Sequence, residues 1–190
     1  MKHVLSVLFL FALGVMPVSC VGPSSRLASV SLRLNGPADV SLDENSASWS
    51  AALTNVGAGA ADLVLPGDGS ESGMRTPLVG WSVIPTGDVR EHPREMPVAE
   101  MARCGNINAI RSPGVVSLAP GETLDLGPWI GQPLFPGPGK YTVAFYYENR
   151  PDLPVTGIPL GVHDAGALSG IRRSAPCSAR SNEVVVVVRQ

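Results

Sequence analysis

The sequence predicts an all-β protein that folds as a sandwich of two sheets. Apolar and polar residues alternate over many short segments, which is the pattern of strands with one buried face. Turn-forming residues separate these segments, with 21 glycines and 18 prolines among 190 residues. Short strands joined by turns describe a sandwich better than a barrel or a βαβ unit, so we expect a single domain of about seven to nine strands.

The start of the chain is typical of an export signal. Lys2 precedes an apolar run from Val4 to Met16. That run is shorter than the roughly 20 residues that a membrane-spanning helix needs, and it has the length of a signal-peptide core. We therefore expect residues 1–20 to be a signal peptide, which places the mature protein in the bacterial cell envelope or outside the cell.

The end of this leader carries a cysteine whose surroundings are informative. The run Met-Pro-Val-Ser-Cys from Met16 to Cys20 resembles a bacterial lipobox, in which the cysteine becomes the first mature residue and carries lipid. This resemblance implies that Cys20 anchors the protein at a membrane. The alternative is ordinary cleavage nearby, with Val18 and Cys20 as the small residues before the cut.

After a short linker over residues 21–27, the single domain is expected to cover residues 28–190. Its first half holds four expected strands, each rich in apolar residues that recur at every second position or form a short apolar run before a turn. These strands cover Ala28–Leu34, residues 49–53, Asp62–Leu65 and Leu78–Ile84.

The second half holds four more expected strands, at Val115–Leu118, Thr123–Leu126, Lys140–Glu148 and Glu183–Arg189. Alternation is clearest in Lys140–Glu148, where aromatic and valine side chains share one face. The last strand carries five consecutive valines. An unbroken apolar run predicts a strand that is covered on both faces.

Two long irregular stretches, 85–113 and 149–181, interrupt the strands as insertions. The second is expected to contain one short helix near Ala165–Arg173, with Asp164 as its N-cap. Connections of such length in a compact domain are usually functional or disordered. They carry polar side chains that can form a binding face, namely Arg103, Asn106, Asn108, Arg150 and His163. The alternative is that their apolar residues Ile107, Ile110 and Leu160 close the open ends of the sandwich.

Two cysteines remain in the mature domain, Cys104 and Cys177. In an oxidising compartment they can form one disulfide bond, which would stabilise the fold by about 4 kcal/mol through loop-closure entropy. The alternative is two separate thiols, because the two insertions are expected at opposite ends of the sandwich and bridged Cα atoms must lie within about 7 Å.

Several residues of the second half resemble bacterial immunoglobulin-like domains. The run Leu118-x-Pro120-Gly121-Glu122, the strand Gly139-x-Tyr141-x-Val143 and the valine-rich end are similar in particular to the intracellular proteinase inhibitor family. The resemblance implies an immunoglobulin-like Greek-key β-sandwich, with two long insertions and one short helix in this chain. It also raises proteinase inhibition as an alternative function.

Within that fold, the resemblance implies roles for four residues. Tyr141 resembles the tyrosine corner, whose hydroxyl bonds back to the preceding chain. Trp81 takes the place of a core tryptophan. Leu53 and Val143 stand where antibody domains carry their inter-sheet cysteines, so apolar packing is expected to join the sheets.

Composition and motifs exclude several classes of function. A net charge of −2 with both signs scattered offers no footprint for DNA or RNA. Ser70 and Ser72 lack the spacing of a nucleophile elbow, and His92 and His163 are interpreted as solvated or capping residues. No cluster has metal-ligand spacing, so we expect no metal and no cofactor.

The sequence therefore predicts a non-enzymatic, exported or lipid-anchored protein that binds another macromolecule through its two insertions. The partner is an unidentified protein or envelope component. An enzyme of unfamiliar type, using His163, Asp164 and Glu148, is the weaker alternative.

Overall fold

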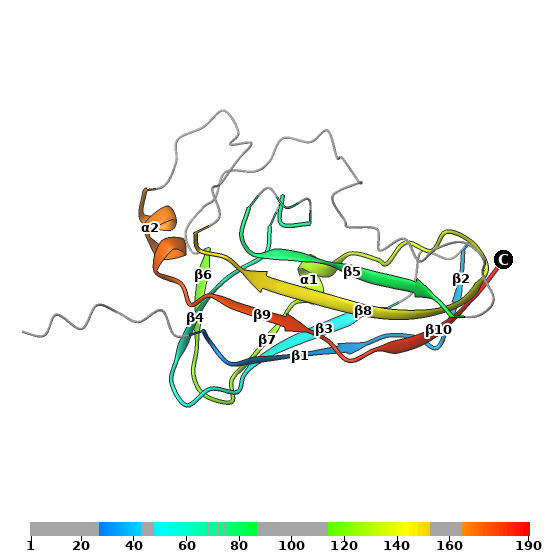
Figure 1. Ribbon diagram of the computed structural model, residues 1–190, viewed down its shortest axis with the longest axis horizontal. Helices are drawn as coiled ribbons and strands as arrows, with labels where there is room; N and C mark the ends of the chain where they lie inside the picture. Colours follow the sequence, from blue (N-terminus) through cyan, green and yellow to red (C-terminus); the bar gives the residue numbers. More distant parts are fainter. Residues whose placement is uncertain are drawn as a thin grey trace, which may run out of the picture.

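A computed structural model describes residues 27–42, 48–67, 69–71, 73, 75–86, 114–152 and 165–190. These residues form an all-β sandwich with two short helices (Figure 1). The long strands of its two sheets run along the longest axis of the molecule, and the C-terminus lies at one end of that axis.

The first sheet contains three antiparallel strands in the order β1-β3-β7. They are β1 (Val30–Asn35), β3 (Ser50–Asn55) and β7 (Thr123–Asp125). Alternate residues of β1 and β3 are buried, as the period-two pattern predicted. Leu32, Leu34, Ala51 and Leu53 face the interior from these two strands.

The second sheet is built around β8 (Gly139–Asn149). Its path runs β2-β10-β8-β5, with β2 (Asp39–Ser41), β10 (Val184–Arg189) and β5 (Leu78–Pro85). The pairing of β2 with β10 is parallel, and the other pairings are antiparallel. A further strand, β9 (Cys177–Arg180), pairs with the second half of β8.

This strand order is that of an immunoglobulin-like domain, so the predicted fold class is confirmed. Such domains place strands A, B and E in one sheet and strands C, F and G in the other. Here β1, β3 and β7 correspond to A, B and E, whereas β5, β8 and β10 correspond to C, F and G. The first strand is divided, because β2 leaves the first sheet and joins β10 in the second.

A bulge separates β9 from β10, since their pairing registers against β8 differ by one residue. The Ser181 hydroxyl accepts a hydrogen bond from the Phe145 N–H at 2.9 Å, which replaces a ladder bond. The Asn182 amide bonds both the N–H and the C=O of Leu34, at 2.9 and 3.0 Å. The bulge therefore joins the second sheet to β1.

The interior between the sheets is apolar and carries a row of aromatic rings. Trp81 packs edge-on against Trp49 at 5.2 Å and against Phe145 at 4.9 Å between ring centroids. Its indole N–H donates to the Ile130 carbonyl at 2.8 Å. This confirms Trp81 as a tryptophan packed on the core.

The tyrosine corner is also present. Tyr141 is buried, and its hydroxyl donates to the Gly137 carbonyl at 2.8 Å. Leu53 and Val143 are both fully buried, so apolar side chains fill the positions that the inter-sheet cysteines would take.

The Leu-x-Pro-Gly-Glu motif forms the tight turn that its residues predict. Gly121 has a φ of 79°, which favours glycine, and the Glu122 N–H donates to the Ala119 carbonyl at 3.0 Å. The Glu122 carboxylate in turn accepts from the Ala119 N–H at 2.8 Å. This turn connects β6 (Val115–Leu118) to β7.

Three further elements complete the described part of the domain. Helix α1 (Gly127–Ile130) spans the side between the two sheets, since Leu126 bonds Ala51 of β3 and Ile130 bonds Trp81 of β5. Strand β4 (Ala61–Val64) pairs with β6 at one end. Helix α2 (Ala165–Arg173) contacts both β4 and β6 there, in the place where the sequence predicted a helix (Figure 1).

Several expectations are corrected by the structure. The described residues form ten strands and two helices, where about seven to nine strands and one short helix were expected, because the three-residue β2, the four-residue β9 and α1 carry no clear local pattern. The valines of β10 are not covered on both faces: Val186 is fully buried, whereas Val185 is 50% exposed and Val187 38% exposed. The stretch 149–181 is not an insertion throughout, because its last part forms β9, which places Cys177 and Ala179 in the core. Among the described residues, no helix is long and apolar enough to cross a membrane.

Candidate functional site

The two insertions leave the sandwich mainly at one end. Gly114, which precedes β6, accepts a hydrogen bond from Leu65 after β4. Arg150 follows β8, and its N–H bonds the Thr76 hydroxyl at 2.7 Å. Helix α2 begins the described part of the second insertion and packs on β4 and β6. We call this region, made of α2, the β4–β6 pair and residues 149–152, the α2 end.

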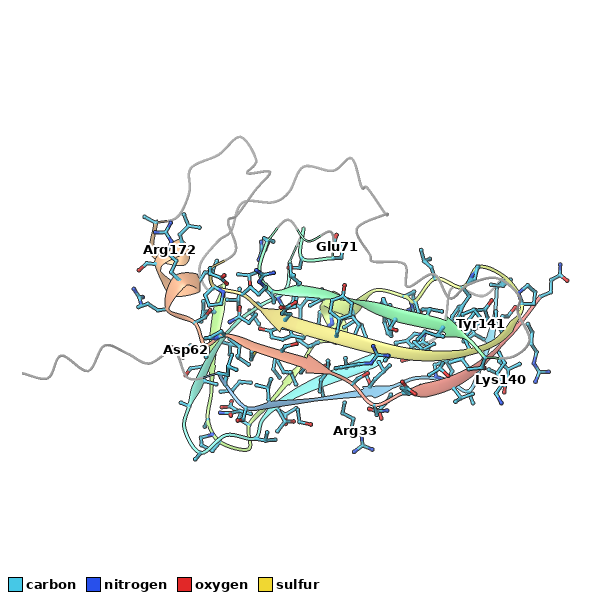
Figure 2. The ribbon with its side chains drawn as sticks, in the orientation of Figure 1. Arg33, Asp62, Glu71, Lys140, Tyr141 and Arg172 are labelled. Atoms are coloured by element: carbon cyan, nitrogen blue, oxygen red, sulfur yellow. The ribbon has the colours of Figure 1, made fainter. Side chains whose placement is uncertain are left out.

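Only one flank of the insertions lies at the other end. The Thr86 N–H donates to the carbonyl of Lys140, which lies at the beginning of β8. Figure 2 shows Lys140 and Tyr141 at one end of the long axis and Arg172 of α2 at the other. Three of the four points where the undescribed segments 87–113 and 153–164 join the fold therefore lie close to the α2 end.

A buried polar network fixes the α2 end to β8. The Asn149 side chain is 1% exposed and accepts from the Thr76 hydroxyl at 3.0 Å. Its amide nitrogen donates to the Ser174 hydroxyl at 2.9 Å and to the Ala175 carbonyl at 2.7 Å. The carbonyl oxygen and the amide nitrogen of this buried side chain are both hydrogen-bonded, so the network holds the residues after α2 in one position.

Cys177 lies beside this network, opposite Asn149 in the β8–β9 ladder. Its side chain is buried, and burial raises the pKa of the thiol from 9.0 to about 11. Tyr147 is buried as well, and its own burial raises the pKa of its hydroxyl, which donates to the Val64 carbonyl at 2.7 Å. Cys177 is therefore a protonated packing residue at neutral pH and not a nucleophile.

Helix α2 presents its charge outward. Ile171 is 2% exposed and packs inward, and Gly170 lies against Val115 of β6. Arg172 and Arg173 in the last turn are both exposed, and Figure 2 labels Arg172. The helix contains no acidic residue, so Arg172 and Arg173 are its only charged side chains.

Other charged groups of the described residues also lie at this end. Arg150 is exposed, as are the two carboxylates of Asp62 on β4 and Asp152 after β8. The Arg173 guanidinium donates to the Ser169 hydroxyl one helical turn away. The α2 end is thus a polar surface of mixed charge, since the partly exposed carboxylate of Glu148 lies next to Asn149 as well.

Of the five residues predicted to bind a partner, the structure places one. Arg150 lies at the α2 end with its side chain exposed. The other four, Arg103, Asn106, Asn108 and His163, lie outside the described residues, as do Cys20, Ser72, His92 and Asp164. Arg172 and Arg173 carry no sequence signal that marks them as a site, because paired arginines at a helix C-terminus are also explained by the helix dipole alone.

The predicted disulfide bond is not supported by the structure. Cys177 is a free thiol, and Cys104 lies outside the described residues. The pairing of these two cysteines stays a prediction.

The described residues offer no grouped metal ligands. Within these ranges, no three side chains of His, Cys, Asp or Glu are grouped to hold a metal ion. Ser70 is buried in a turn, where its hydroxyl accepts from the Gly67 N–H at 3.1 Å. It therefore serves the loop before β5.

Two of the three comparisons with known proteins find no match. No family model matches the chain, so the resemblance to the proteinase inhibitor family is not confirmed. No curated protein matches either. A search of solved structures finds the CARDB domain of a Pyrococcus furiosus protein, crystallised in complex with di-metal ions.

That CARDB domain shares 13% identity with this chain, and the match covers 86% of this chain and 90% of the other. The TM-score is 0.27, at which the likeness carries no argument about function. The class of protein follows instead from the strand order described above, which is that of an immunoglobulin-like β-sandwich.

Proposed function

We propose that this chain is a non-enzymatic, exported immunoglobulin-like domain that binds another macromolecule at the α2 end, where its insertions meet the sandwich. The partner is a protein or another component of the cell envelope. The observation that carries the proposal is the convergence of three insertion flanks beside an exposed, basic helix. Loops on a rigid scaffold are the usual place for binding residues.

The described core supports a division of roles between a scaffold and the loops that bind the partner. The described core consists of residues from β1 to β10, and the Asn149 network fixes α2 to it. The insertions therefore extend from a rigid platform, and Arg103, Asn106, Asn108, Arg150 and His163 are the side chains that we propose for contact with the partner.

Site-specific photo-crosslinking tests the position of the binding surface. A benzophenone amino acid replaces exposed Ala165, the first residue of α2, in protein expressed in its natural host. The matched control carries the same group at exposed Lys140, at the opposite end of the domain (Figure 2). We expect a discrete crosslinked product from position 165 and none from position 140. Equal products from both positions, or a product from position 140 alone, would contradict the proposal.

We further propose that lipid on Cys20 holds the mature protein at a membrane. The lipobox-like run before Cys20 supports this. Cells producing wild-type protein or Cys20→Ala are fractionated, and the mass of the mature N-terminus is measured. Wild-type protein is expected in the membrane fraction with an added lipid mass. An unlipidated mature N-terminus in the wild-type protein would contradict the proposed lipid anchor.

Proteinase inhibition is not proposed. The residues that carried the resemblance form a β-turn and a tyrosine corner, which are structural features of many sandwich domains. These features account for the fold, and none of them supports an inhibitory activity.

A further inference from the structure

The chain enters the domain at the α2 end. The Ala28 N–H donates to the Pro176 carbonyl at 2.9 Å, directly between α2 and β9. The beginning of β1 therefore lies beside the residues that follow α2, at the end of the molecule where α2 is drawn (Figure 1).

The length of the linker limits how the domain sits on a membrane. Between Cys20 and Leu27 the chain can span at most about 25 Å, at roughly 3.6 Å per residue. Strand β8 runs from Gly139 to Asn149, and at about 3.3 Å per residue it is about 33 Å long. A lipid anchor on Cys20 thus brings the α2 end to the membrane before the end that carries Lys140.

The surface that is held there is suited to anionic headgroups. Arg172 and Arg173 are exposed on a helix that has no acidic side chain, and Arg150 is exposed nearby. Guanidinium groups bind phosphate with paired hydrogen bonds. The carboxylates of Asp62, Asp152 and the partly exposed Glu148 oppose this attraction, so the contact is weak by itself. A tether strengthens it, because a short linker raises the effective concentration to the millimolar range.

We propose that the α2 end faces the membrane and that Arg172 and Arg173 bind the phosphates of anionic lipids. This inference rests on the proposed lipid anchor and goes beyond the proposed function, because it adds a lipid ligand at the end of the domain where the insertions meet the sandwich. It assigns a ligand to two residues that share one helix turn.

Hydrogen exchange on tethered protein tests this orientation. The chain from Val21 to Gln190 carries an N-terminal histidine tag and is attached to vesicles through a nickel-chelating lipid. This chain keeps every described residue, since the first of them is Leu27 and Ala28 already packs against the core. Exchange of the α2 amides is compared between vesicles containing phosphatidylglycerol and vesicles of phosphatidylcholine. We expect exchange about threefold slower, or slower still, on the anionic vesicles.

Matched variants assign the effect to these residues. The double variant Arg172→Gln, Arg173→Gln is expected to exchange at the same rate on both vesicles, whereas Lys140→Gln is expected to behave as wild type. Equal exchange of wild-type α2 on both vesicles would overturn the proposal. Slowing that persists in the double variant would also overturn it. Because the tag supplies the tether, the result is independent of lipid on Cys20, which the fractionation of Cys20→Ala measures separately.

Discussion

Gly36 lies in van der Waals contact with Trp49 and leaves no room for a side chain. A Cβ atom built on Gly36 would lie 2.1 Å from the Cζ3 atom of the Trp49 ring, far inside any allowed contact. The indole cannot withdraw, because it packs against Trp81 in the aromatic row of the core. Gly36 is also the point where the chain passes from β1 towards β2.

We therefore expect Gly36→Ala to lower the free energy of unfolding by about 3 kcal/mol, the upper range for overpacking a core. Urea denaturation measures this change. Gly59→Ala is the matched control, since nothing lies within 4 Å of its built Cβ, and it should change stability by less than about 0.5 kcal/mol. Equal effects of the two substitutions would contradict the described packing of Gly36 on Trp49.

The raised pKa of the Cys177 thiol predicts how the free energy of unfolding depends on pH. Its burial raises the thiol pKa from 9.0 to about 11, so the unfolded chain loses this proton at lower pH than the folded chain does. The resulting stabilisation is present below pH 9 and is lost as pH rises from 9 towards 11. The stability of wild-type protein should thus fall more between pH 8 and pH 10 than that of Cys177→Ala.

Urea denaturation at both pH values measures this difference, and the reaction of unfolded protein with a thiol reagent counts the free cysteines. If Cys177 is bonded to Cys104, the thiol cannot ionise. Wild-type protein would then lack the extra pH dependence and would also lack two reactive thiols, those of Cys104 and Cys177, and the description of Cys177 as a free thiol would be wrong.

At the scale of elements, strand β10 shows how a uniform sequence acquires two different faces. Its five valines carry no alternation, yet Val186 is fully buried and Val185 is half exposed. The cause is the position of β10: its core face packs between the sheets, whereas the other face belongs to the outer surface of the sheet. Exposed valine is favourable in a strand because of its β-propensity.

Substitution by threonine, which is nearly the same shape, separates the two faces of β10. Val186→Thr should lower the free energy of unfolding by about 1–3 kcal/mol, since it buries a hydroxyl among apolar side chains. Val185→Thr should change it by less than about 0.5 kcal/mol. Denaturation curves measure both, and equal costs would indicate that β10 is covered on both faces after all.

The elements that the sequence predicted are those whose local pattern agrees with their tertiary role. The eight expected strands all form within a few residues of their expected bounds, and α2 covers its expected range. Strand β2 was missed because its three residues have no period and are held by parallel pairing with β10. Strand β9 was missed because its sequence, Cys-Ser-Ala-Arg, lacks large apolar residues and lies in an irregular stretch.

At the scale of the whole molecule, the fold could be predicted much more completely than the candidate site. Alternation of apolar residues determines which faces are buried, and burial determines the sandwich. A binding surface is determined by which exposed residues meet in space. The end of α2 lies near the beginning of β1 because the Ala28 N–H donates to the carbonyl of Pro176, a contact that no local pattern indicates.

The same arrangement gives the molecule two distinct ends. The chain enters beside α2 and finishes beyond β10, at the opposite end of the long axis (Figure 1). The near end carries Arg150, Arg172, Arg173 and most insertion flanks, whereas the far end carries Lys140, exposed Arg189 and the tyrosine corner (Figure 2). The difference between the two ends of the domain therefore follows from its strand order.

All of these conclusions depend on the two sheets having one shared interior. Methyl nuclear Overhauser contacts in protein labelled at leucine and valine test this directly. We predict a continuous network that joins Leu32 and Leu53 of the first sheet to Val143 and Val186 of the second, because all four lie in one buried cluster. Two separate networks, with no contact between the leucines and the valines, would contradict the sandwich.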